Sequence, residues 1–203
     1  MLFISACSYK SELDSFYYCR KLEFTCTKKD IIVSFKTSKG DFDVKLFGED
    51  NPVTVTNFIE NIKKKIYINQ KFYKIIKYPQ SKVIHSGVYP ASDFYLEKNK
   101  NANKIKPAIP LEISFKKGIK PKYKYQAKDP FEIMNIKNFF ERGSIAMAKS
   151  GEKNSSSTEF FFVTNKIPEL DGRYSTFGKI VKGFEVLEKI DKKDFIYDIK
   201  IFD

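Results

Sequence analysis

The chain has very few residues that bind transition metals or act as nucleophiles. Its 203 residues include one histidine, three cysteines and no tryptophan. The cysteines are Cys7, Cys19 and Cys26, and all precede residue 30, so they cannot form a metal cluster inside the domain that follows. A Ser-His or Cys-His catalytic pair would have to use His85, the single histidine. We therefore expect no metal and no cofactor. Hydrolysis stays open, although its usual catalytic groups are missing, and a reaction that breaks no covalent bond would not need them.

The chain also lacks long apolar runs and has fewer acidic than basic residues. No stretch of 18 apolar residues occurs, so we expect no transmembrane span. The formal net charge of +12 favours an anionic partner, such as nucleic acid, an anionic membrane surface or an acidic protein. The lysines are spread along the whole chain, without a groove-reading helix or an RNP-like run. We therefore expect no dedicated nucleic-acid binding.

The first seven residues carry a possible lipidation signal. The run Ile4-Ser5-Ala6-Cys7 resembles a bacterial lipobox, in which cleavage occurs before a cysteine that then carries lipid. It predicts lipidation of Cys7 and a membrane-anchored protein of the cell envelope. The alternative is a chance apolar start, a free thiol and a cytoplasmic protein. Six residues are too few for a charged region and an apolar region, so the anchor requires a start further upstream.

The length suits one domain with appendages. Residues 1–29 are interpreted as an anchor or tether, in which Cys19 and Cys26 remain as an even pair that fits an oxidising compartment. Residues 30–203 form the domain. Within it, residues 116–138 are basic and aromatic and are interpreted as an insertion, which is either a surface loop or an arm that contacts a partner.

Apolar periodicity places the elements of the domain. Asn51 followed by Pro52 predicts the start of a helix that runs to about Lys65, and a second, short helix is expected at 184–190. Alternation of apolar and polar residues predicts the strands. They are expected at 30–37, 41–47, 72–78, 82–86, 111–115, 145–148, 160–164, 175–180 and 195–202.

The stretch 143–178 organises the domain. Its run Phe160-Phe161-Phe162-Val163 is too apolar for a solvated edge strand. One face of this strand must therefore belong to the core, and the other must be covered or line a pocket. Core packing alone is the alternative interpretation of such a run.

The order of motifs in this stretch resembles the cyclophilin family of peptidyl-prolyl isomerases. The matching blocks are Ala146-Met147-Ala148, Glu159-Phe160-Phe161, and Leu170-Asp171-Gly172 followed by Phe177-Gly178-Lys179-Ile180. Two upstream blocks agree with the family as well, Phe72-Tyr73-Lys74-Ile75-Ile76 and the helix start at Asn51–Phe58. The resemblance implies a mostly β fold, a closed antiparallel β-barrel of about eight strands with two capping α-helices.

The resemblance also implies a site that isomerises X-Pro bonds without a cofactor. The catalytic cation of the family is an arginine, and Lys74 stands at that position. The residues that match the family's substrate-binding positions are Phe72, Val83, His85, Ala148, Lys149, Glu159, Phe161, Leu170 and Tyr174.

Several of these positions depart from the family. His85 and Glu159 each replace a glutamine, Lys149 replaces an asparagine or arginine, and Glu169 replaces a tryptophan or histidine. Lys74 keeps the charge of the arginine but not its planar fork of donors.

The sequence therefore predicts an isomerase of reduced activity that acts on proline-containing segments of extracytoplasmic proteins. The alternatives are a non-catalytic module that binds proline segments, and a surface interaction protein that uses the basic insertion.

Overall fold

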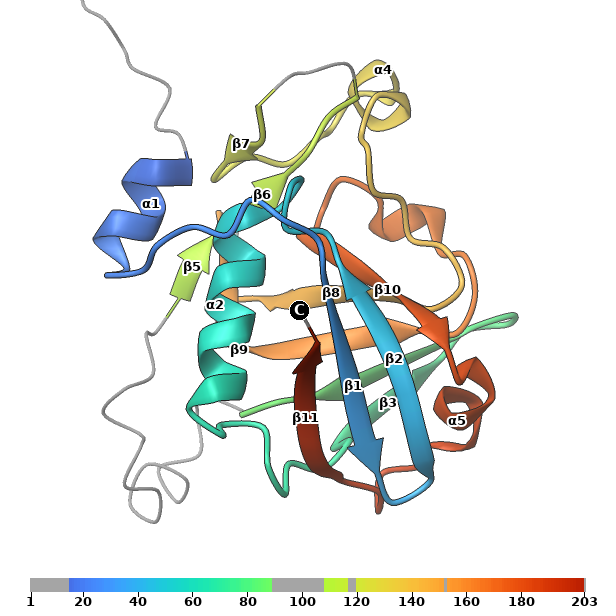
Figure 1. Cartoon of the computed structure of the whole chain (residues 1–203). Coiled ribbons are helices and arrows are strands. Elements are labelled where there is room, and N and C mark those ends of the chain that lie inside the picture. The colour runs from blue at the N-terminus through green and yellow to red at the C-terminus, as the bar shows by residue number, and fades with distance from the viewer. Residues whose placement is uncertain (1–14, 89–107, 117–119, 152, 203) are drawn as a thin grey trace, which may run out of the picture.

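The computed structural model describes residues 15–88, 108–116, 120–151 and 153–202, which fold mostly as β-structure (Figure 1). The strands are β1 Ile31–Thr37, β2 Gly40–Leu46, β3 Lys74–Lys77, β4 Lys82–Ser86, β5 Ala108–Pro110, β6 Glu112–Ile113, β7 Lys122–Tyr123, β8 Ser144–Lys149, β9 Asn154–Val163, β10 Thr176–Lys182 and β11 Ile196–Phe202. The helices are α1 Ser15–Lys21, α2 Pro52–Lys63, α4 Pro130–Met134 and α5 Phe184–Lys189, with a 3-10 turn at Pro168–Leu170. No helix within the described ranges is long and apolar enough to cross a bilayer.

The described strands form a nine-stranded antiparallel sheet that curls into a half-barrel around α2 (Figure 1). Its order is β11-β1-β2-β10-β8-β9-β4-β3, with β5 added to β9, and β6 and β7 form a separate pair. The expected strands and both expected helices are present. The described residues add α1 and α4, so four α-helices replace the two that were expected.

The prediction of a closed barrel is wrong, because the end strands β11 and β3 do not pair with each other. The segment ahead of β3 meets the start of β11 instead, through the bridge of Lys71 to Phe195 and backbone hydrogen bonds between residues 69–72 and 194–196. Lys65 and Asn69 adopt positive φ angles of 57° and 61°, so the chain turns repeatedly before it reaches β3. β3 therefore begins beyond the short segment that contacts β11, and the sheet stays open.

The two faces of β9 set the position of the site. Phe160 and Phe162 are fully buried in the large core between the sheet and α2. Phe161 lies between them in the sequence and belongs to a second apolar cluster on the other face of the sheet. This alternation confirms that one face of the aromatic run is core and that the other has a separate environment.

The start of α2 is capped by a residue far away in the sequence. Asn51 was expected to be the cap, but its side chain makes no capping hydrogen bond. The carboxylate of Glu112 instead accepts from the backbone N–H groups of Val53 and Thr54, at 3.2 and 2.8 Å. It also accepts from the hydroxyls of Thr54 and Tyr123, at 2.6 and 2.9 Å. These bonds tie the pair β6–β7 to the N-terminus of α2, where a carboxylate is favoured.

Glu112 is completely buried, and its burial outweighs the hydrogen bonds that stabilise its charge. Burial raises the pKa of this carboxyl to about 7, although the donors from Thr54, Tyr123 and Val53 act to lower it. The folded protein therefore holds the proton of Glu112 at pH values where an unfolded chain has lost it.

Glu112→Gln is expected to remove a pH dependence from the stability of the protein. The acid's pKa rises from 4.5 to about 7 on folding, so its contribution to the free energy of unfolding falls as the pH rises between these values. The fall is about 3 kcal/mol. His85 acts with the opposite sign, because its pKa is lowered to about 4. The measured quantity is therefore the difference between wild type and variant in urea unfolding at each pH, and a constant difference would contradict the buried, protonated carboxyl.

The described residues of the N-terminal extension, from residue 15, and of the segment interpreted as an insertion both take part in apolar clusters. A disulfide joins Cys19 to Cys26, and Tyr18 and Cys19 pack with Val53 of α2. The insertion contributes Ala127 and Ile136 to a small apolar cluster with β6. Cys7, the expected lipidation site, lies outside the described residues.

Candidate functional site

A row of side chains crosses four neighbouring strands on one face of the sheet. Lys74 of β3 pairs with His85 of β4, and His85 pairs with Phe161 of β9. Phe161 pairs in turn with Ala146 of β8. Directly opposite residues of antiparallel strands point to the same face, so these four side chains lie side by side. The row begins with an exposed cation and ends in an apolar cluster.

The ring of Phe161 is the centre of that cluster. It stacks on Phe140 with the ring centroids 5.7 Å apart and the planes at 4°, and the Tyr174 ring meets it edge-on at 5.2 Å. The His85 ring lies on it with a centroid distance of 5.2 Å. Phe161 is 2 % exposed, so the surrounding rings cover it almost completely. The residues around it are Val83, Ala146, Ala148, Val163 and Ile167, with Ile76 and Leu170 half-buried beside them.

Lys74 and His85 are the two polar side chains of the row, and they differ in charge. Lys74 is the first residue of β3 and is exposed. Burial, and then the charge of Lys74, lower the pKa of His85 to about 4. His85 is therefore neutral at pH 7 and can offer one hydrogen-bond donor and one acceptor. The positive charge in this row comes from Lys74.

Glu159 is a buried acid next to the row. It accepts a short hydrogen bond from the hydroxyl of Tyr73, the residue that precedes Lys74. Burial raises the pKa of Glu159, whereas the bond from Tyr73 and the charge of Lys74 act to lower it. Glu159 thus places a second polar group within the electrostatic reach of the cation.

Helix α2 fixes the part of β9 that carries Glu159. The register between β8 and β9 shifts between Met147 and Lys149, and the β9 residues opposite this shift bulge out. The side-chain amides of Asn57 and Asn61 both donate to the backbone carbonyl of Ser157 in the bulge, each at 2.7 Å. The core helix therefore sets the conformation of the strand just before the site.

The structure brings together most of the residues expected in the site. Lys149 ends β8, and its Nζ lies 5.2 Å from the centre of the Tyr174 ring. Leu170 ends the 3-10 turn and packs against the cluster. The structure does not bring Phe72 to this group, because its ring is fully buried in the large core. The expected site residues that do lie in or next to the row and its apolar cluster are Lys74, Val83, His85, Ala148, Lys149, Glu159, Phe161, Leu170 and Tyr174.

Three residues of the site were not singled out from the sequence. Tyr73 lies inside a block that resembles the family, but its role depends on Glu159, 86 residues away. Phe140 precedes the strands of the organising stretch and shows no alternation of its own. The carboxylate of Asp171 accepts a hydrogen bond from the backbone N–H of Phe140 at 2.7 Å and so fixes the position of Phe140. Ala146 was named as part of a family block, and strand register is what places it opposite Phe161.

The curled antiparallel sheet carries a cation and an aromatic cluster in one row. The sequence profile described as cyclophilin type peptidyl-prolyl cis-trans isomerase/CLD matches residues 32–201. The chain belongs to this family and is a cyclophilin-type peptidyl-prolyl cis-trans isomerase.

Curated relatives carry the same activity in their names. A peptidyl-prolyl cis-trans isomerase of Helicobacter pylori strain 26695 is 27% identical over 173 residues, which cover 84% of this chain and 86% of the relative. A putative thylakoid lumen peptidyl-prolyl cis-trans isomerase of Synechocystis is 30% identical over 181 residues, covering 83% of this chain and 46% of the relative.

Solved structures agree on the fold. A crystal structure of a cyclophilin-type isomerase from Cryptosporidium parvum matches with a TM-score of 0.57 and 24% identity, over 86% of this chain and 99% of that chain. A cyclophilin from Hirschia baltica matches with a TM-score of 0.59 and 15% identity, over 92% of this chain and 79% of that chain.

Proposed function

We propose that the row on the sheet is the catalytic site, that Lys74 is its catalytic cation, and that the protein isomerises X-Pro bonds of extracytoplasmic polypeptides at a reduced rate. The observation that carries the proposal is the register of Lys74, His85 and Phe161 across three adjacent strands. It puts a cation at one end of a short row and an aromatic ring two strands away. A proline ring on the aromatic side would direct its imide bond towards the cation.

The reaction needs few chemical groups. Amide resonance imposes a barrier of about 20 kcal/mol on rotation about the X-Pro bond. The catalyst must bind the twisted amide more tightly than the planar one. Apolar side chains such as Phe161, Val83 and Leu170 hold the proline ring, while Lys74 stabilises the changed dipole of the twisted imide. No proton leaves the substrate and no covalent bond breaks.

Two features account for a reduced rate. An ammonium group is a hydrated point charge, so Lys74 cannot supply the two parallel donors of a guanidinium. The Phe161 ring is covered by His85 and Tyr174 in the free protein. Uncovering the ring costs free energy and so weakens the binding of substrate.

A protease-coupled assay on an X-Pro peptide tests the proposal. The protease cleaves only the trans form, so the slow phase of cleavage reports the isomerisation of the cis form. We expect the rate of that phase to increase linearly with the concentration of this protein, by a modest slope. A slope of zero together with saturable peptide binding would instead support the non-catalytic binding module.

We also propose that the protein works in the cell envelope, attached to the membrane through Cys7. The run Ile4-Ser5-Ala6 before Cys7 supports the attachment. The disulfide between Cys19 and Cys26 supports an oxidising compartment, where such bonds persist. The Synechocystis relative is named as a thylakoid lumen protein, which agrees with a location outside the cytoplasm.

Cys7→Ser is expected to shift the protein from the detergent phase to the aqueous phase. Protein expressed from its full upstream reading frame should enter the detergent phase at cloud-point separation, because an acylated cysteine brings long apolar chains. The Cys7→Ser variant should stay in the aqueous phase. The control is Cys26→Ser, which opens the disulfide but keeps Cys7 and should still enter the detergent phase. Aqueous partitioning of the wild type would remove the anchor from the proposal.

A further inference from the structure

A cavity of about 600 Å³ lies between the N-terminal extension and the segment that leads into β7. Its lining residues are Ser15, Phe16, Arg20, Phe24, Thr25, Cys26, Lys28, Lys120, Pro121 and Tyr123. Seven of these ten precede residue 32, where the match to the isomerase family begins. The cavity is thus built mainly by a part of this chain that the family domain does not include.

Both walls of the cavity are fastened to the domain. The disulfide between Cys19 and Cys26 closes the loop that carries Arg20 and Phe24. On the other wall, the ring of Tyr123 packs on Tyr18 of α1 with a centroid distance of 4.6 Å. Its hydroxyl donates to Glu112 at 2.9 Å, and Glu112 caps α2. A cavity with fastened walls loses little entropy when a ligand enters it.

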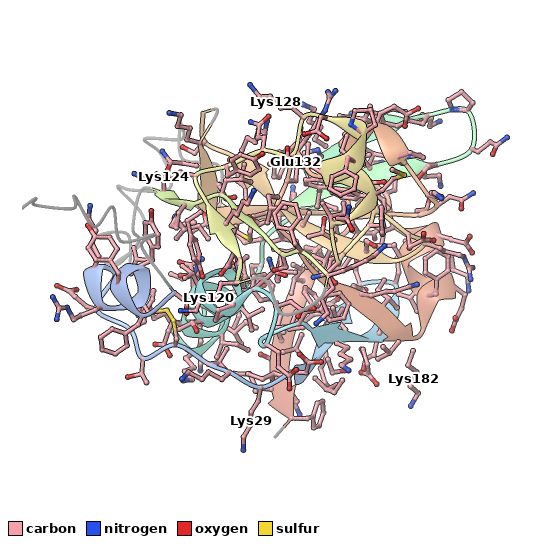
Figure 2. The ribbon with its side chains drawn as sticks, turned by 90° about the horizontal axis from the view of Figure 1, so that it is seen from above. Lys29, Lys120, Lys124, Lys128, Glu132 and Lys182 are labelled. Atoms are coloured by element: carbon pink, nitrogen blue, oxygen red, sulfur yellow. A yellow bond between two sulfur atoms is a disulfide. The ribbon has the colours of Figure 1, made fainter. Side chains whose placement is uncertain are left out.

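Among the described residues, the lining combines cations with aromatic rings and includes no acid. Arg20, Lys28 and Lys120 are exposed cations, and Phe16, Phe24 and Tyr123 are the rings. Figure 2 shows Lys120 beside the blue helix α1, and Lys182 at the opposite side of the molecule. This lining fits a ligand that joins an anionic group directly to an apolar body.

The edge of the cavity exposes large apolar side chains to solvent. Phe16 is 69% exposed and its neighbour Tyr17 is 38% exposed. Exposed aromatic residues next to cations are typical of segments that lie in the interface of a bilayer. Phe16 borders the cavity itself, so a ligand inside the cavity and a bilayer at its mouth could be contacted together.

We propose that this cavity binds the phosphate headgroup of an anionic phospholipid while Phe16 enters the bilayer interface. An acidic polypeptide would also neutralise the cations. A phospholipid in addition places its phosphate next to apolar chains, so it can contact the cations of the cavity and the exposed ring of Phe16 together. The choice of a membrane rests on the proposed location in the cell envelope, whereas the site itself rests on the cavity. The headgroup site is distinct from an acyl anchor and does not require one.

Sedimentation with vesicles tests the site without the anchor. The Cys7→Ser protein should bind vesicles that contain both phosphatidylglycerol and phosphatidylcholine. It should bind much more weakly to vesicles of phosphatidylcholine alone. Replacing Arg20, Lys28 and Lys120 together by Gln should lower the partition coefficient on the order of 100-fold, since each cation near an anionic surface contributes about 5-fold. The matched control replaces Lys182, Lys192 and Lys193 by Gln and should lower it only a few-fold.

Three further outcomes decide the proposal. Phe16→Ser should weaken vesicle binding and leave X-Pro turnover unchanged. The lipid site can therefore be disproved without disproving the isomerase activity, and the reverse. Equal losses in the two triple variants would overturn the site, because general charge would then explain the binding. Binding of a soluble polyglutamate peptide without binding to anionic vesicles would overturn the lipid and indicate an acidic polypeptide.

Discussion

Lys74→Ala is expected to abolish isomerase activity, and Lys74→Arg is expected to raise it. One well-placed donor to a developing charge contributes about 2.7–4 kcal/mol, which is on the order of 10²–10³ in rate. The ammonium of Lys74 supplies part of this stabilisation, and a guanidinium at the same position would supply two donors in a fixed fork. The expected gain for Lys74→Arg is therefore roughly 10-fold or more in kcat/KM.

The control for this pair is on the same strand. Lys77 is the last residue of β3, is also exposed, and alternates to the other face of the strand. Lys77→Ala and Lys77→Arg should leave kcat/KM within about two-fold, because surface changes away from a site have small effects. If a folded Lys74→Arg protein has no activity above the uncatalysed rate, then His85, Glu159 and Lys149 have changed the site beyond rescue by a guanidinium.

Phe161→Ala is expected to have the second large effect, on both stability and peptide binding. Its ring is almost fully buried and packs against Phe140, Tyr174 and His85. Truncating such a ring costs about 3–5 kcal/mol of stability. Peptide affinity should fall by about 1–3 kcal/mol, because the wall that holds the proline ring is lost.

Phe161→Leu keeps this test informative if the alanine variant does not fold. Leucine fills most of the volume, so the expected loss of stability is smaller, at about 1–2 kcal/mol. It still lacks the flat ring that the proline would contact. Affinity for an X-Pro peptide, measured by titration on the folded variant, should drop while Phe160→Leu in the core leaves it nearly unchanged. Equal affinity in Phe161→Leu and wild type would place Phe161 outside the site.

The sequence predicted the elements of the sheet well, because alternation is a local property. The run Phe160-Phe161-Phe162 shows this most clearly, since its two faces separate into the large core and the second cluster, as alternation requires. Nothing local indicates how a sheet ends. The closed barrel was inferred from the resemblance, whereas the end strands β11 and β3 do not pair with each other.

The errors arose where distant residues determine a local structure. Asn51 has the residue type of a helix cap, but Glu112, 61 residues further on, caps α2 through its buried carboxylate. β9 was expected to begin near Phe160 after a polar loop, yet it begins at Asn154. Its polar residues are buried and satisfied, as when Asn57 donates to Ser157, 100 residues away. Such partners cannot be read from a window of sequence.

For the proposed site, the sequence indicated which residues to consider but not their surroundings. Lys74, His85 and Phe161 were each assigned from separate blocks, and strand register aligns them. The cover over Phe161 and the neutral state of His85 were not predicted, since both depend on burial. Phe72 was assigned to the site from the same block as Lys74, but the side chain turns into the core.

Exchange NMR of an X-Pro peptide with the unmodified protein tests the central claim most directly, because it reads binding and turnover in one sample. We expect exchange cross-peaks between the cis and trans signals of the peptide at mixing times too short for the uncatalysed reaction. The same peaks should vanish with Lys74→Ala and strengthen with Lys74→Arg. Peptide signals that shift on addition of the wild type and Lys74→Arg proteins, without any exchange cross-peak from either, would contradict catalysis at this row.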